Sequence, residues 1–128
     1  MPRHLFLLLT FTLAALLATC KQGPVTGVKV LIGPTVVPQA GARPIEDAII
    51  IIAQDKITAV GERKDIPVPQ ASDRTDLSGQ WVIPATGYFI TVGDKANMII
   101  LKNAPNGIKP AAEADIAGRI VAGEWEIH

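Results

Sequence analysis

The body of this chain contains no histidine: of its 128 residues, the two histidines are His4 and His128, close to the two ends. A zinc or iron centre needs several nitrogen, oxygen or sulfur ligands held in a fixed geometry. A hydroxyl nucleophile needs a base such as histidine beside it. The sequence therefore predicts no metal ligand, no bound cofactor and no catalytic residue.

Cysteine, aromatic residues and net charge are also scarce. Cys20 is the single cysteine, so no disulfide can form within the chain and the fold must rest on its apolar core. Aromatic residues make up 5% of the sequence, and 12 basic residues balance 12 acidic ones. Nucleic-acid surfaces depend on positive charge and on rings that stack against bases. Nucleic acid is excluded as a partner on these grounds.

The N-terminal segment is the most hydrophobic part of the chain. Arg3 and His4 precede an apolar run over residues 5–19, which is shorter than the roughly 20 residues that span a bilayer. This pattern is typical of a secretory signal peptide. Residues 17–20 resemble the bacterial lipobox, which implies that Cys20 is lipidated and becomes the mature N-terminus. The alternative is an ordinary signal peptide with an incidental cysteine.

The lipobox resemblance sets the expected location. It divides the chain into a signal peptide at 1–19, a tether at 20–27 and a domain at 28–128. The expected product is an exported lipoprotein of the bacterial envelope that faces the periplasm and reaches the membrane through Cys20. Lys21, where an aspartate would retain such proteins at the inner membrane, favours the outer membrane.

The domain is predicted to be all-β. Short runs of alternating or β-branched residues, separated by glycine and proline, indicate a small β-sandwich. The expected strands cover residues 28–32, 35–37, 48–53, 57–61, 74–77, 80–83, 89–92, 97–102 and 115–122. A helical turn is expected within 111–117, and a turn closed by an aromatic residue at 123–125.

Four segments, in this order, resemble the metal-dependent amidohydrolase superfamily, which includes imidazolonepropionase-, dihydroorotase- and prolidase-like enzymes. They are residues 55–61, 76–84, 91–101 and 120–125. In that superfamily a β-sandwich is built from sequence on both sides of a (β/α)₈ barrel. The resemblance implies an N-terminal arm over 28–86 and a C-terminal arm over 87–128. A barrel needs roughly 200–250 residues, so it is missing here.

The departures from the family decide the expected function. After the segment that ends in Pro84, the family continues into a His-Xaa-His pair that ligates the first of its divalent metals, usually zinc. This chain continues Ala85-Thr86-Gly87 instead, so none of those ligands carries over. Asn97 stands where the family usually has an aspartate that shapes the start of a strand. Family members hydrolyse C–N bonds in amides, ureas and dipeptides, and this chain lacks the residues for that chemistry.

Three interpretations remain open. The chain is an amidohydrolase reduced to its sandwich and not catalytic, or a lipid-anchored module that docks on a barrel-bearing hydrolase or another envelope partner, or an incomplete version of a working hydrolase. The first two predict that the former barrel-facing surface is apolar and supports self-association or docking. They also predict that residues 80–83 and 89–92 lie together at one edge, as a hairpin.

Other polar and aromatic residues have plainer explanations. The carboxylates of Glu46, Asp47, Glu62 and Asp65 lie beside turns and are expected on the solvated surface. Trp81 and Trp125 are expected to plug the core or its edges rather than to bind a ligand.

Overall fold

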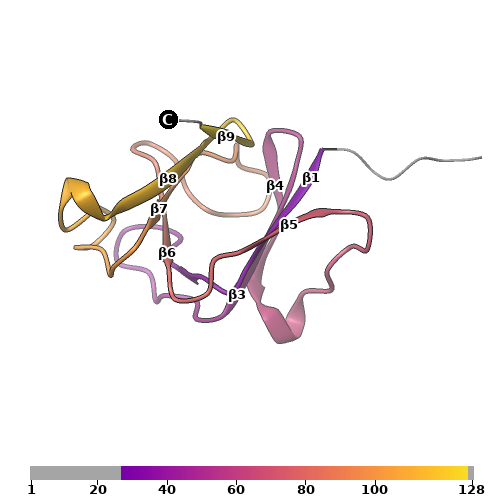
Figure 1. The fold of residues 1–128 in the computed structure, drawn as a ribbon, viewed down its shortest axis with the longest axis horizontal. Coiled ribbons are helices and arrows are strands. Elements are labelled where there is room, and N and C mark those ends of the chain that lie inside the picture. The colour runs from indigo at the N-terminus through magenta and orange to yellow at the C-terminus, as the bar shows by residue number, and fades with distance from the viewer. Residues whose placement is uncertain (1–26, 127–128) are drawn as a thin grey trace, which may run out of the picture.

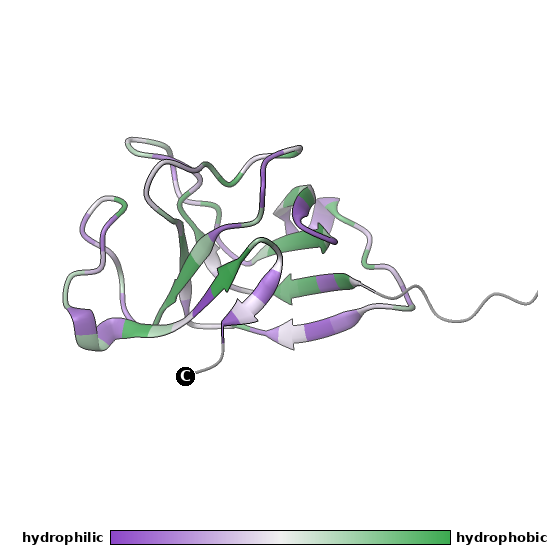
Figure 2. Ribbon diagram, turned by 90° about the horizontal axis from the view of Figure 1, so that it is seen from above, coloured by the Kyte–Doolittle hydropathy of each residue, from purple (hydrophilic) through white to green (hydrophobic). Residues whose placement is uncertain are grey.

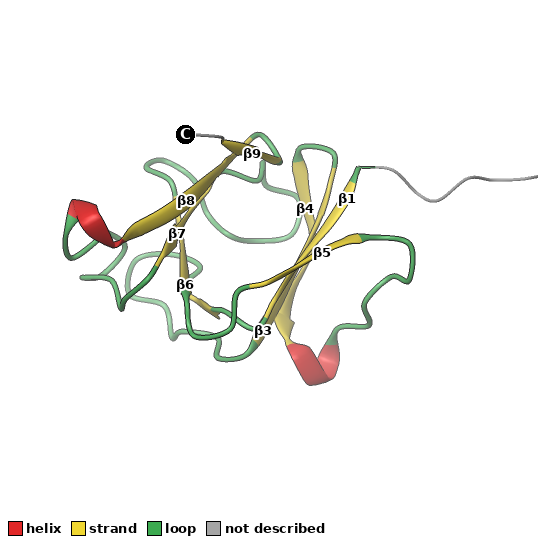
Figure 3. Cartoon of the chain, in the orientation of Figure 1, coloured by secondary structure: helices red, strands yellow, loops and turns green. Residues whose placement is uncertain are grey.

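The computed structural model describes residues 27–126, so the expected signal peptide and Cys20 lie outside the described residues. The described chain forms two β-sheets and two short 3-10 turns, η2 (Arg63–Asp65) and η3 (Glu113–Asp115) (Figures 1 and 3). The prediction of an all-β fold is confirmed, and the two sheets are consistent with a small β-sandwich. Within residues 27–126 no helix is long and apolar enough to cross a membrane.

The first sheet has four strands in the order β4-β3-β1-β5. Their bounds are β1 (Val28–Ile32), β3 (Ala48–Ala53), β4 (Lys56–Glu62) and β5 (Asp73–Asp76). β3 pairs antiparallel with β1 and β4, and β5 pairs parallel with β1. Because β3 is an unbroken β-branched run, it suits a position covered on both faces: Ile49, Ile50 and Ile52 are fully buried. The charged β5 forms an edge and is largely hydrophilic in Figure 2, which protects the edge from further pairing.

The second sheet has five strands in the order β2-β6-β7-β8-β9. Their bounds are β2 (Thr35–Val36), β6 (Trp81–Pro84), β7 (Met98–Leu101), β8 (Ile116–Val121) and β9 (Glu124–Glu126). β6 runs parallel to β2 and antiparallel to β7. The second sheet thus combines strands from both expected arms, whereas every strand of the first sheet precedes residue 77.

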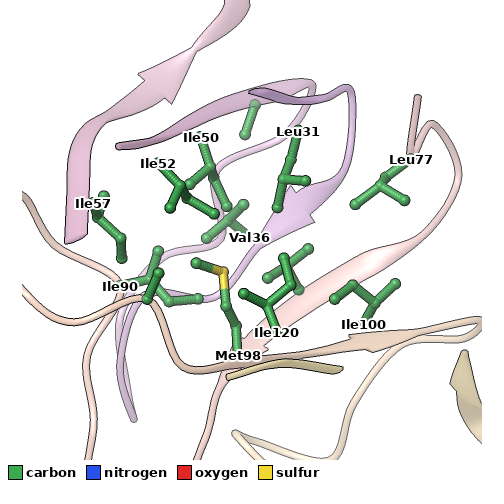
Figure 4. Close-up of a cluster of buried hydrophobic side chains, with 13 residues drawn as sticks. Leu31, Val36, Ile50, Ile52, Ile57, Leu77, Ile90, Met98, Ile100 and Ile120 are labelled. Atoms are coloured by element: carbon green, nitrogen blue, oxygen red, sulfur yellow. The ribbon is translucent and has the colours of Figure 1, made fainter. Parts of the chain in front are cut away.

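The main core lies between the two sheets. Side chains alternate across a strand, and one set from each sheet points into this layer, as Figure 4 shows. The buried members are Leu31, Val36, Ala48, Ile50, Ile52, Ile57, Leu77, Val82, Ile90, Ala96, Met98, Ile100 and Ile120. Each large member stabilises the fold by about 1.5–3 kcal/mol relative to an exposed position. This layer replaces the disulfides that the sequence cannot form.

Two smaller apolar clusters lie away from this layer, because the alternate side chains point to the opposite faces. Loops contribute to both clusters. The cluster on the first sheet includes Val30, Ile49 and Ile51, with Ile66 and Val68 from the loop after η2. The cluster on the second sheet includes Val37, Ile83 and Leu101, with Trp81 and Ile108. Trp125 packs against the main core, so both tryptophans join apolar clusters, as expected.

The strand expected at 89–92 is absent, and the hairpin expected between 80–83 and 89–92 is wrong. β6 already pairs with β2 on one side and β7 on the other. No edge of β6 is therefore free for residues 89–92. The strand that returns beside β6 is β7, with Pro84 opposite Met98.

Two further local predictions differ from the structure. Residues 123–125 were expected to be a turn, but the turn lies at Ala122 and Gly123, and β9 begins at Glu124. β9 pairs with β8, with Trp125 opposite Ile120, because its aromatic side chain reaches the core from a strand position. The helical turn expected within 111–117 is limited to η3, since β8 begins at Ile116.

Candidate functional site

The joining segment, residues 85–97, connects β6 to β7 and occupies the position where the family resemblance would place the barrel. The Ala85 N–H donates to the Asn97 carbonyl at 3.0 Å, so the two ends of the segment lie side by side. A turn follows, in which the Tyr88 N–H donates to the Ala85 carbonyl at 3.0 Å. Gly87 has φ of 88° in this turn, a conformation that glycine adopts without strain.

The middle of the joining segment is fixed by one buried side chain. Ile90 is 1% exposed and belongs to the main core, and its N–H donates to the Pro38 carbonyl at 3.0 Å. On either side of it, Phe89 is 52% exposed and Val92 is 64% exposed. The segment is thus held to the sandwich by Ile90 while it presents apolar side chains to solvent.

The end of the joining segment crosses to the first sheet. The Ile57 N–H donates to the Asp94 carbonyl at 2.9 Å, and the Gly93 N–H donates to the Ile57 carbonyl at 2.8 Å. The Ala96 N–H donates to the Asp55 carbonyl at 2.7 Å. These three bonds fasten residues 93–96 to the turn between β3 and β4 and to the start of β4.

The turn between β8 and β9 packs on the same place. An added Cβ at Gly123 would lie 1.9 Å from the Gln54 carbonyl oxygen, so only glycine fits there. The Gly123 N–H donates to the Ala96 carbonyl at 3.0 Å. The Gln54 N–H donates to the Gly27 carbonyl at 3.0 Å, which brings in the first described residue of the chain. We call this meeting point of three turns and the start of β1 the tether end; it lies at the top of Figure 1.

Asn97 is the buried side chain that holds the turn between β8 and β9 at the tether end. It is 7% exposed, and its Oδ1 accepts the Ala122 N–H at 2.8 Å. Ala122 has φ of 50°, an uncommon conformation for a residue with a side chain. An aspartate would offer the same acceptor oxygen. Position 97 was expected to shape local structure, and the bond from the Ala122 N–H is the contact through which Asn97 does so.

Four large hydrophobic side chains are exposed in the described chain, and we call them the apolar patch: Tyr88, Phe89, Val92 and Val121. Val92 precedes Gly93 and Val121 precedes Ala122, so both border the tether end. A hollow of about 270 Å³ connects Tyr88 with Val121, and Ile99 and Arg119 also line it. Val121 could not be singled out from the sequence, because nothing in the β8 pattern distinguishes an exposed valine from a buried one.

Exposed lysines accompany the apolar patch. Lys56 and Lys95 are paired across an antiparallel bridge at the tether end. Both are exposed, whereas the neighbouring Asp55 and Asp94 are half-buried, and the Thr91 hydroxyl donates to the Asp94 carboxylate. Among residues 27–126, no carboxylate lies within salt-bridge distance of either lysine. Glu124, next to Gly123, is also exposed, but it contacts Lys29 at 3.3 Å. Lys56 and Lys95 are thus the exposed charges at this end that have no ion-pair partner among residues 27–126, and both are positive.

The acidic side chains of the described residues do not form a metal site. No group of three or more histidine, cysteine, aspartate or glutamate side chains is placed to hold a metal ion between residues 27 and 126. Two of the acidic residues singled out from the sequence form surface ion pairs. Asp47 contacts Arg63 at 2.9 Å, and Glu62 contacts Lys64 at 3.3 Å.

One carboxylate has a shifted pKa. The Ser78 hydroxyl and the Ser78 N–H both donate to Asp76 Oδ1, at 2.6 and 2.9 Å, and these two bonds lower the pKa of Asp76. The positive charge of Arg63 lowers that pKa further. Asp76 is exposed, and its bonds close the turn between β5 and β6. Its role here is that of a turn residue.

Known proteins show little similarity to this chain. No family model matches the chain, and no curated protein matches it. Among solved structures, local similarity is found to molinate hydrolase, with a TM-score of 0.42 and 26% sequence identity. The match covers 48% of this chain and 13% of the hydrolase chain. Similarity at this TM-score is too low to support an argument about fold or activity.

Proposed function

We propose that this chain is a membrane-anchored β-sandwich module of the amidohydrolase type that carries no catalytic centre of its own. The observation that supports this proposal best is the direct pairing of β6 with β7. The motifs in these strands are the ones that flank the barrel in the family. Here residues 85–97 alone connect them, without a histidine. Such a module would act by binding at a membrane surface rather than by catalysing a reaction.

The first experiment measures metal and activity in the purified mature chain, from Cys20 to His128. After incubation with zinc and dialysis, we expect less than stoichiometric metal and no hydrolysis of amides or dipeptides. The reason is that a catalytic zinc needs three protein ligands in one place. One bound ion per chain, together with activity that a chelator abolishes, would contradict the proposal.

The anchoring half of the proposal needs a separate measurement. Mass spectrometry of the membrane fraction of an expressing bacterium is expected to find Cys20 as the N-terminal residue, with covalently bound acyl chains. Two chains on one cysteine hold a protein stably, whereas a single chain binds only marginally. An unmodified Cys20 in the soluble periplasmic fraction would contradict it.

A second candidate function is assembly with a barrel-bearing hydrolase chain. The exposure of Tyr88 and Phe89 in the joining segment favours it, because the family places its barrel at this point. A photo-crosslinking amino acid at Phe89 is expected to capture such a hydrolase in cells, identified by mass spectrometry. The same probe at Lys64, at the opposite end, serves as the control. Crosslinks to lipid, or none, would count against this candidate.

A further inference from the structure

We propose that the tether end of the sandwich rests on the surface of a lipid bilayer, with the apolar patch and the two exposed lysines facing the headgroups. This inference rests on the proposed anchoring through Cys20. It goes further by assigning one end of the domain as a membrane contact and one orientation to the anchored molecule.

The first argument is where the chain enters the fold. Gly27 lies at the tether end, bonded to Gln54 in the turn between β3 and β4. Residues 21–27 can span at most about 25 Å when fully extended. An anchor at Cys20 therefore keeps the tether end close to the bilayer. The opposite end, with Gly33 and Ser78, lies at the far end of β1.

The second argument is the distribution of exposed apolar side chains. Val92 and Val121, which are 64% and 52% exposed, flank the turns that meet at the tether end, and Tyr88 shares a hollow with Val121. None of the large exposed hydrophobic side chains of residues 27–126 lies at the opposite end. Exposed apolar side chains that gather at one place mark an interaction surface. Here it coincides with the point of attachment.

The third argument is charge. Lys56 and Lys95 are exposed beside the patch, while Asp55 and Asp94 are set back. Exposed lysines are attracted to the negative surface of an anionic leaflet. Apolar side chains flanked by exposed lysines suit the boundary between headgroups and acyl chains. A phospholipid surface with anionic lipids is therefore the occupant that matches both features.

The experiment attaches the mature chain to lipid nanodiscs by a chemical coupling rather than by cellular processing. Because Cys20 is the single cysteine, its thiol can be coupled to a maleimide lipid in nanodiscs that contain anionic phospholipid. A paramagnetic headgroup lipid then broadens the amide signals of residues near the bilayer. We expect signals of residues 92, 95, 121 and 122 to lose at least about five-fold more intensity than those of Lys64 and Ser78.

Two variants with the same change in net charge test whether the apolar patch causes the orientation. Val92→Asp combined with Val121→Asp lowers the net charge by two, and Lys64→Glu lowers it by the same amount at the opposite end. We expect the double variant to reduce the difference between the two ends to what the tether alone imposes, and Lys64→Glu to leave the difference unchanged. Both change exposed positions, and circular dichroism checks that both remain folded.

Equal broadening at both ends of the wild-type chain would overturn the orientation. So would an unchanged profile in the folded double variant, or crosslinking of the patch to a protein in cells. Since the maleimide lipid supplies the anchor, this result does not depend on whether cells lipidate Cys20 or on whether the chain binds metal. Failure of the orientation and failure of the proposed function are thus separate outcomes.

Discussion

At the residue scale, the tether end depends on a few contacts between side chains and backbone. Asn97 is the one buried polar side chain among residues 27–126. Its Oδ1 accepts a hydrogen bond from the N–H of Ala122, whose backbone has an uncommon conformation. Buried polar groups without a partner destabilise a fold. The stability of the tether end should therefore depend on single polar atoms, such as the acceptor oxygen of Asn97.

Replacing Asn97 tests this contact. Asn97→Ala removes the acceptor of the Ala122 N–H and is expected to lower the free energy of unfolding by about 1–3 kcal/mol. Asn97→Asp keeps an acceptor oxygen and is expected to lower it less. Urea denaturation of the three proteins measures the difference. If both variants lose the same stability, the hydrogen bond is not the important feature of the side chain.

Asp76 predicts a dependence on pH. Its pKa is lowered in the fold by the Ser78 bonds, so the ionised form is favoured in the folded state. The resulting stabilisation is present above the pKa of the unfolded chain, about 4, and is lost as the pH falls through the folded pKa. We expect the wild type to be slightly more stable than Asp76→Asn at pH 7 and equal to it at low pH. Thermal unfolding over the acid range measures this, and a constant difference would contradict it.

At the element scale, the strands with strong local signals could be predicted from the sequence. β1 and β3 begin and end where the β-branched runs and their glycine and proline boundaries placed them. Residues 89–92 also consist of aromatic and β-branched residues, yet they are not a strand. Strand formation needs a free partner edge, and the local sequence contains no information about that. The same limit applies to Glu124 and Trp125, which lie in β9 because β8 offers a free edge.

The joining segment tests whether burial without a strand still stabilises. Ile90→Ala is expected to lower the free energy of unfolding by about 2–5 kcal/mol, because the side chain is almost fully buried in the core. Val92→Ala is the matched control in the same segment and is expected to change it by less than about 0.5 kcal/mol. Equal effects in urea denaturation would mean that Ile90 does not anchor the segment.

At the scale of the whole molecule, the two expected arms do not correspond to the two sheets. The motifs predicted one sandwich from both arms, and the strands do form two sheets with a shared core. Which strand joins which sheet, and the contact of the three turns at the tether end, depend on packing between distant segments. Gly123 was visible in the sequence only as a glycine, and its close approach to Gln54 appears only in three dimensions.

The exposed turn at Thr86 and Gly87 should accept an insertion. The ends of the joining segment are already bonded, so a flexible linker of about ten residues there adds mainly loop entropy, below about 1 kcal/mol. The same linker between Ala122 and Gly123 is expected to destabilise the fold severely, because it separates two residues that bond to Asn97 and Ala96. Thermal unfolding compares the two. A similar loss of stability at both sites would contradict the view that the turn at residues 86–87 tolerates insertion.

The division of strands between the sheets also sets an order in which the fold can be completed during synthesis. A ribosome delivers the N-terminus first, so all four strands of the first sheet are available once Asp76 has emerged. The isoleucines of β3 that face the main core then have little cover until β6, β7 and β8 follow. The nascent chain therefore passes through a stage in which the first sheet is complete but its core-facing side is exposed to solvent. A chaperone that shields extended apolar chain would be needed most in that interval.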